Sequence, residues 1–141
     1  MQTKPVLSRD DTIRIVQAAR EEAIRNGWAV CIAVVDDGGH PLALERLDGC
    51  APIGAYIATE KARTAALGRR ETRVYEEMIN AGRTAFLSAP TIAGMLEGGI
   101  PLIVDGHVIG AVGVSGVKPD QDAQVARIGS DTVQSLRKVF Q

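Results

Sequence analysis

The sequence predicts an α/β fold of the α+β kind, in which helices pack on an antiparallel sheet formed by two β-hairpins. Two observations support this prediction. Apolar residues recur at helical spacing near both ends of the chain and again in its middle. Two apolar segments are each interrupted by a turn of acidic residues and glycine, at 36–39 and 105–106. The paired strands therefore follow one another directly, without the helical crossover that parallel strands need.

Length and composition indicate a single domain over residues 1–141. Hydrophobic residues make up 45% and charged residues 23% of the chain, as is typical of soluble globular proteins. The net charge is −1 with acids and bases interspersed, so neither a nucleic acid nor a membrane is an expected partner. The N-terminus lacks the apolar segment of a signal peptide, so we expect a cytoplasmic protein.

The first helix is expected to begin at Ser8, whose side chain can cap the free N–H groups of the first turn. Asp10 and Asp11 suit the positive end of the helix dipole. The helix is expected to end at Asn26-Gly27, because glycine readily takes the left-handed conformation of a helix cap. Its predicted apolar stripe consists of Ile13, Val16, Ala19, Ala23 and Ile24.

Residues 28–49 are predicted to form the first hairpin, with Asp36 and Asp37 shaping its turn. Cys31 lies in the apolar run of the first strand, so its thiol is expected to be buried. Cys50 is the only other cysteine, and two cysteines argue against a disulfide framework.

Residues 52–69 are predicted to form a helix with proline near its start. Its small face would allow close packing on a sheet or another helix, and consists of Ala55, Ala58, Ala62, Ala65 and Ala66. A shorter helix is expected over 72–81, with Val74, Met78 and Ile79 pointing inward. Residues 83–99 are expected to be irregular.

Residues 102–104 and 108–114 are predicted to form the second hairpin, and residues 120–139 the last helix. The inward face predicted for that helix consists of Ala123, Val125, Ala126, Ile128, Val133, Leu136 and Val139. The predicted order of elements is therefore α-β-β-α-α-β-β-α.

The segment 98–116, GGIPLIVDGHVIGAVGVSG, contains six glycines. Its GxxGxxG motif has neither dinucleotide-binding nor P-loop spacing, and it lies inside a predicted strand instead of at a helix N-terminus. Gly110 and Gly113 are three positions apart, so they face opposite sides of the sheet. We therefore expect them to let a helix or another chain approach the sheet backbone closely.

Four segments resemble the GlcG/HbpS-like family: VVDDGGHPLALERLDG, IATEKARTAA, GGIPLIVDGHVIGAVGVSG and QDAQVARIG. The resemblance extends over roughly residues 8–139. It implies a profilin-like fold and assembly into homodimers or larger homo-oligomers. It also implies heme or a related tetrapyrrole as the ligand.

His40 and His107 are the only histidines, and each follows a predicted hairpin turn. A neutral imidazole can ligate heme iron, so both are candidate metal ligands if heme is bound. The alternative is that both are solvated surface residues. Because the resemblance points to no single axial ligand, both interpretations stay open.

A second group of candidates lies between the first hairpin and the helix that follows it. Arg46 and Lys61 match basic positions of the family and are expected to hold a carboxylate, either a heme propionate or a small organic acid. Thr64 shares a helix face with Lys61. The alternative is structural, with an ion pair between Arg46 and Asp48 or between Lys61 and Glu60.

Ser115-Gly116 and Asp122 match the GVSG…QD pattern of the same family. Asp122 is therefore expected to cap the last helix or to hold the GVSG loop. A serine nucleophile is not expected, because GVSG is not the GxSxG of a nucleophile elbow.

These observations favour a small ligand-binding protein whose ligand is heme or a related tetrapyrrole. The alternative is an isomerase, tautomerase or lyase acting on a small hydroxy or keto acid. In that enzyme Arg46 and Lys61 would clamp the substrate carboxylate, and Glu60 or Asp48 would be the general base. A third hypothesis is a structural partner of a larger enzyme. Pocket polarity separates the first two, because heme requires a large apolar slot.

Overall fold

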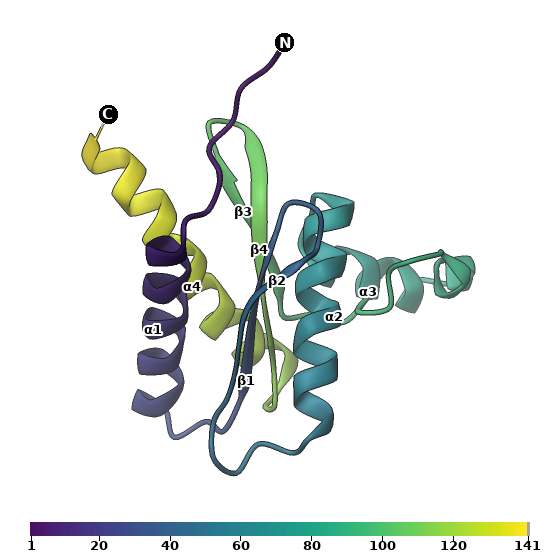
Figure 1. Ribbon diagram of the computed structural model, residues 1–141. Helices are drawn as coiled ribbons and strands as arrows, with labels where there is room; N and C mark the ends of the chain where they lie inside the picture. Colours follow the sequence, from purple (N-terminus) through teal and green to yellow (C-terminus); the bar gives the residue numbers. More distant parts are fainter. Residues whose placement is uncertain (141) are drawn as a thin grey trace.

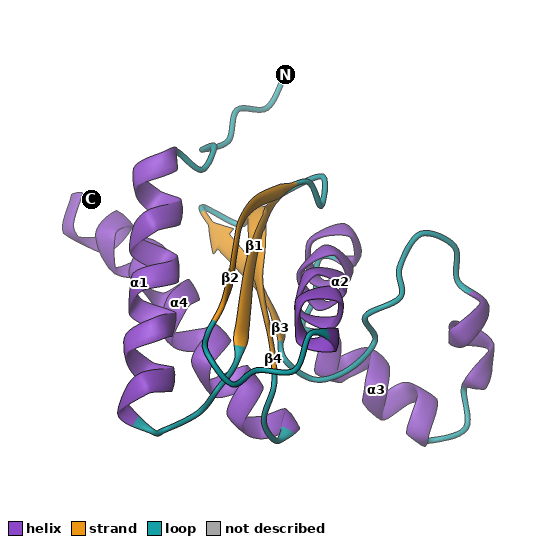
Figure 2. Ribbon diagram, turned by 60° about the horizontal axis from the view of Figure 1, so that its bottom comes forward, coloured by secondary structure: helices purple, strands orange, loops and turns teal. Residues whose placement is uncertain are grey.

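A four-stranded sheet lies between two layers of helices in the computed structural model (Figures 1 and 2). The structure describes the backbone of residues 1–140 and the side chains of residues 1–133. The elements are α1 (Arg9–Arg25), β1 (Cys31–Asp36), β2 (Pro41–Arg46), α2 (Ile53–Gly68), α3 (Thr72–Asn80), a 3-10 helix (Thr84–Ser88), β3 (Gly99–Val104), β4 (His107–Ser115) and α4 (Pro119–Phe140). The predicted α+β class and order of elements are confirmed, with the short 3-10 helix added.

The strand order is β2-β1-β4-β3, and every neighbouring pair is antiparallel. Each hairpin therefore supplies one central and one edge strand. Both hairpin tips lie at one end of the sheet, and the connections of β1 and β2 to α1 and α2 lie at the other (Figure 1). The second hairpin is longer than expected, because β3 begins at Gly99 instead of residue 102.

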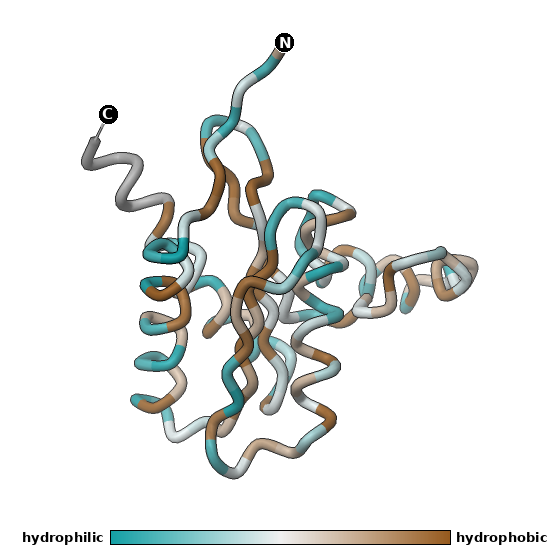
Figure 3. The backbone as a smooth tube through the Cα atoms, viewed as in Figure 1, coloured by the Kyte–Doolittle hydropathy of each residue, from teal (hydrophilic) through white to brown (hydrophobic). Residues whose placement is uncertain are grey.

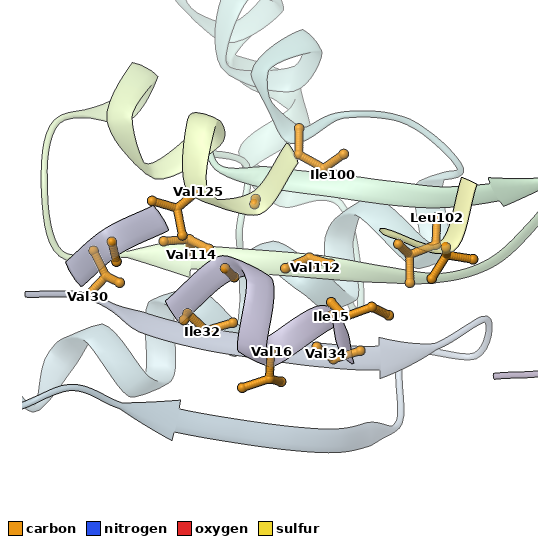
Figure 4. Close-up of a cluster of buried hydrophobic side chains, with 14 of the residues drawn as sticks. Ile15, Val16, Val30, Ile32, Val34, Ile100, Leu102, Val112, Val114 and Val125 are labelled. Carbon is orange, nitrogen blue, oxygen red and sulfur yellow. The ribbon is translucent and has the colours of Figure 1, made fainter. Parts of the chain in front are cut away.

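The central strand β1 is buried on both faces, which explains its continuous apolar run. Ile32 and Val34 pack into the cluster beneath α1 and α4, shown in Figure 4. Ala33 and Val35 pack into a second cluster against the alanines of α2. Figure 3 shows apolar residues along the central strands, whereas α1 carries both hydrophilic and apolar residues.

The start of α1 follows from a capping box at Ser8. Asp11 N donates to Ser8 Oγ at 3.1 Å, and Ser8 N donates to Asp11 Oδ2 at 2.9 Å. The buried stripe is offset from the predicted one: Ile15 is fully buried, whereas Ile13 and Ile24 are 44% and 62% exposed. Positions 15, 19 and 23 face the sheet, and 13 and 24 fall outside that stripe.

The other helices also differ in detail from the prediction. In α3, Thr72 and Tyr75 are buried, and the expected inward residues Val74, Met78 and Ile79 are only half-buried. This helix packs mainly on the 3-10 helix instead of the sheet, so its apolar face has less to cover it. In α4, Val125, Ala126 and Val133 are buried and Ile128 is 36% exposed, whereas Leu136 and Val139 lie outside the described side chains.

Two glycines of β4 face opposite sides of the sheet and each meets backbone from another element. A Cβ added to Gly113 would overlap the carbonyl oxygen of Ala58 in α2. A Cβ added to Gly110 would overlap the carbonyl oxygen of Val35 and lie 2.7 Å from Leu7 Cδ1. The predicted close approach of a helix to the sheet backbone is therefore confirmed at Gly113, whereas Gly110 meets the neighbouring strand β1 and the side chain of Leu7.

We expect Gly113→Ala to lower the free energy of unfolding by about 1–3 kcal/mol, because the added methyl group must push α2 away from β4. Gly38→Ala is the control, since the nearest atoms to its added Cβ belong to side chains of the hairpin turn, the nearest 3.0 Å away on His40, and not to backbone. That variant is expected to stay within about 0.5 kcal/mol of the parent protein. Urea denaturation of both variants measures the difference. Equal stability of the two would contradict the packing argument.

Candidate functional site

Lys61 lies inside the protein, where α2, β4 and α4 meet. Its Nζ donates to the Val114 carbonyl at 2.9 Å and lies 3.2 Å from Asp122 Oδ2. Lys61 and Asp122 are each 3% exposed. Gly98 covers the ammonium group, since a Cβ at Gly98 would lie 2.8 Å from Nζ. The structure therefore gives Lys61 an internal partner and does not bring it to the surface beside Arg46.

Asp122 also holds the loop that precedes α4. Its Oδ1 accepts a hydrogen bond from Val117 N at 3.1 Å, so the expected role in holding the GVSG loop is confirmed. Burial raises the pKa of Asp122, and the Lys61 ammonium and the Val117 N–H oppose that rise. Both oxygens of this carboxylate are therefore engaged in structural contacts.

The neighbours of Lys61 on α2 also have structural partners. Thr64 is fully buried, and its Oγ1 accepts a hydrogen bond from Gly94 N at 3.0 Å. Glu60 is half-buried and pairs with Arg63 Nη1 at 2.8 Å. The ion pair expected between Lys61 and Glu60 is not formed, because each residue pairs elsewhere.

Arg46 and Asp48 lie at the exposed end of the first hairpin. Arg46 is the last residue of the edge strand β2, and Asp48 follows in the loop that leads to α2. Within the described residues neither side chain forms an ion pair, so the expected Arg46–Asp48 pair is absent. Both charges therefore face solvent and are available to a ligand.

Arg46 belongs to a surface that we call the β2–α2 face, defined by Leu44, Arg46, Ile53, Tyr56 and Leu67. Leu44 and Arg46 are register partners of Ala33 and Cys31, which pack on the α2 side of the sheet. Ile53, Tyr56 and Leu67 form one stripe along α2 and are 60%, 74% and 37% exposed. The β2–α2 face therefore combines apolar side chains with one unpaired arginine.

The two histidines lie at the hairpin tips, at the same end of the sheet (Figure 1). His40 is exposed, and its Nδ1 lies 3.2 Å from Asp36 Oδ1, which also accepts hydrogen bonds from Gly38 N and His40 N. The turn-shaping role predicted for Asp36 is confirmed. His107 is half-buried at the start of β4, two strands away from β2. Nothing brings the two imidazoles together.

The described residues contain no group of three or more histidine, cysteine or acidic side chains arranged to hold a metal ion.

Cys31 and Cys50 are both buried free thiols, as the sequence predicts for Cys31. Burial raises the pKa of Cys31 from its ordinary value of 9.0 to about 11. Among the described helices, none is long and apolar enough to cross a membrane.

Comparison with known proteins gives consistent matches. A family model described as "Haem degrading protein HbpS-like" matches residues 7–131. Protein GlcG of Escherichia coli K12 is 64% identical over 115 residues, which are 82% of this chain and 85% of GlcG. The crystal structure of HbpS matches with a TM-score of 0.86 and 29% identity over 94% of both chains. The crystal structure of a PduOC:heme complex matches with a TM-score of 0.81 and 24% identity over 90% of this chain and 94% of PduOC.

We expect Asp122→Ala to destabilise the protein by about 3–5 kcal/mol, because it leaves the Lys61 ammonium buried without a counter-charge. The double variant Lys61→Met with Asp122→Leu removes both charges, and is expected to recover most of that loss. Urea denaturation at neutral pH measures both effects. A single variant as stable as the parent protein would show that the buried pair is not a structural requirement.

The pKa of Cys31 predicts a loss of stability in alkali. In the unfolded chain the thiol ionises near pH 9, whereas the folded protein holds the proton up to about pH 11. The stabilising contribution is therefore fully present below pH 9 and is lost as the pH rises through 11, by as much as about 2–3 kcal/mol. Urea denaturation between pH 8 and 11 tests this, with Cys31→Ala as the control. The free energy of unfolding should fall more steeply with rising pH in the parent protein than in Cys31→Ala. An equal fall in both proteins would contradict the prediction.

Proposed function

The chain belongs to the HbpS-like family, and on that premise we propose that it binds heme or a closely related tetrapyrrole on the β2–α2 face. The family description refers to heme, and PduOC, which shares the fold, was crystallised as a heme complex. The chemistry of this chain's own residues provides further support. Heme supplies a redox-active iron that needs an axial ligand, and two propionates that need cationic partners.

The contact between His40 and Asp36 is the observation that carries the proposal. A carboxylate on one ring nitrogen is the usual way in which proteins fix the orientation of an imidazole that binds a metal. Nδ1 of His40 faces Asp36 Oδ1, so Nε2 is left toward solvent as the candidate iron ligand. Asp36 is itself fixed by two backbone N–H groups of the turn, which makes the arrangement preorganised.

Arg46 is the candidate partner for a propionate. It forms no ion pair within the described residues, and a free guanidinium can hold a carboxylate with two parallel hydrogen bonds. His40 directly precedes β2 and Arg46 ends it six positions later, so the two are at most about 20 Å apart. Leu44 lies between them and is 53% exposed, which suits the apolar body of a porphyrin.

A second copy of the chain would complete the proposed site. Tyr56 and Leu44 are largely exposed, whereas ligand sites bury most of their ligand. We therefore propose that a homodimer or larger homo-oligomer covers the β2–α2 face and encloses the tetrapyrrole. The apolar stripe of α2 and the edge strand supply the surface that such an interface needs.

The alternative enzyme hypothesis requires Arg46 and Lys61 to hold one carboxylate together. Because the Lys61 ammonium is enclosed by Gly98, Val114 and Asp122, that clamp would need the buried pair to open. Glu60, one of the two candidate bases, is paired with Arg63, whereas Asp48, the other, forms no ion pair within the described residues. The geometry therefore favours the binding protein over the small-acid enzyme.

Titration of the purified protein with hemin, followed by visible absorption, tests the proposal. We expect a saturable Soret shift that His40→Ala abolishes and His107→Ala leaves intact. Arg46→Ala is expected to weaken the affinity about tenfold by removing a charge-assisted hydrogen bond. Arg9→Ala, which removes an exposed arginine from α1, is the control and should bind as the parent does. A featureless, non-saturating titration would exclude heme as the ligand.

A further inference from the structure

We propose that a pocket between Trp28 and Asp48 binds a small organic cation, such as a primary alkylammonium ion. The pocket has a volume of about 330 Å³ and is lined by Ile24, Gly27, Trp28, Ala29, Leu47 and Asp48. Ile24 belongs to the last turn of α1, and the other lining residues belong to the loop from α1 to β1 and the loop from β2 to α2. Both loops lie at the end of the sheet opposite the hairpin tips (Figure 1), so the pocket is separate from His40.

Backbone hydrogen bonds hold both walls of the pocket in place. Trp28 N donates to the Ala23 carbonyl at 2.9 Å, which fixes the chain as it leaves α1. Leu47 N donates to the Val30 carbonyl at 2.9 Å, which ties the second loop to the first. Because these bonds connect the two loops to the ordered elements, a ligand would enter a pocket that is already formed.

The charges around the pocket favour a cation. Asp48 contributes a carboxylate that has no ion-pair partner within the described residues. Arg25 lies close by in the last turn of α1, but it is paired with Glu22 at 3.2 Å. Arg46 lies on the opposite side of β2, facing α2. The pocket also adjoins the C-terminal, negative end of the α1 dipole.

The remaining lining suits an alkyl group that carries such a charge. Among the aromatic side chains, an indole gives the strongest attraction for an ammonium ion. Ile24 and Leu47 provide apolar surface for a short carbon chain. An anion of the same shape would be repelled by Asp48, and a neutral alcohol would gain the apolar contact and a hydrogen bond without the attraction between opposite charges. The combination therefore selects the charge as well as the size of the ligand.

Fluorescence titration reports directly on this pocket, because Trp28 is the only tryptophan in the chain. The heme-free protein is titrated with butylammonium chloride, butan-1-ol and sodium butyrate at constant ionic strength. A probe of this size is expected to bind at about millimolar concentration. We expect a saturable change with butylammonium and a weaker response or none with the other two probes.

Two matched variants separate a local contact from a change in net charge. Asp48→Asn is expected to weaken butylammonium binding about two- to fivefold by removing the carboxylate. Asp10→Asn removes one negative charge at the far end of α1 and should bind as the parent does. Equal responses to butylammonium and butan-1-ol, no saturation, or unchanged binding in Asp48→Asn would each overturn the proposal. Equal weakening in both variants would do so as well. None of these results depends on whether the protein binds heme.

Discussion

The direct contact between the backbones of α2 and β4 determines where the other groups of this protein lie. Gly113 has no side chain, and Ala58 packs straight onto it, so the helix lies closer to the sheet than ordinary side chains would permit. On the next turn, Lys61 extends along this contact to the carbonyl of β4. Gly94 and Gly99 pass over the α2 backbone near Lys61, where a Cβ would overlap backbone atoms. The same closeness leaves no space around the ammonium group for an external ligand.

The buried pair of Lys61 and Asp122 follows from that contact. Removing two charges from water is costly, and their mutual attraction offsets the cost only when their other polar atoms are also bonded. Here the Val114 carbonyl and the Val117 N–H supply those bonds. Within the described residues, no buried side-chain nitrogen or oxygen lacks a hydrogen-bond partner. We infer that the pair acts mainly to fix α4 against α2, since apolar side chains of similar volume would stabilise the interior equally well.

Local patterns predicted the fold because local chemistry forms most of it. The Ser8 capping box, the Asp36 turn and the spacing of Gly110 and Gly113 each depend on residues close together in the chain. The partner of Lys61 could not be predicted in this way, because Asp122 is 61 positions distant. The sequence did, however, contain an indication that Lys61 is buried. Lys61 lies three residues after Ala58 and four before Ala65, on the small face of the helix. Its match to a basic family position favoured a surface role instead.

The buried polar side chains of the described residues are hydrogen-bonded within the protein. The charged groups that we propose as ligand contacts therefore lie around the edge strand β2. One side of β2 pairs with β1, so the strand is fixed, while its other side has no partner strand among the residues that the structure describes. The turn before it carries His40, its last residue is Arg46, and the loop after it carries Asp48. The register with β1 places Arg46 on the α2 side of the sheet, whereas Leu47 packs with Trp28 on the α1 side. Alternation therefore separates Arg46 from Leu47, and the turn that follows β2 brings Asp48 beside Leu47 and Trp28 in the pocket. The two ligands that we propose would therefore bind on opposite faces of one short hairpin.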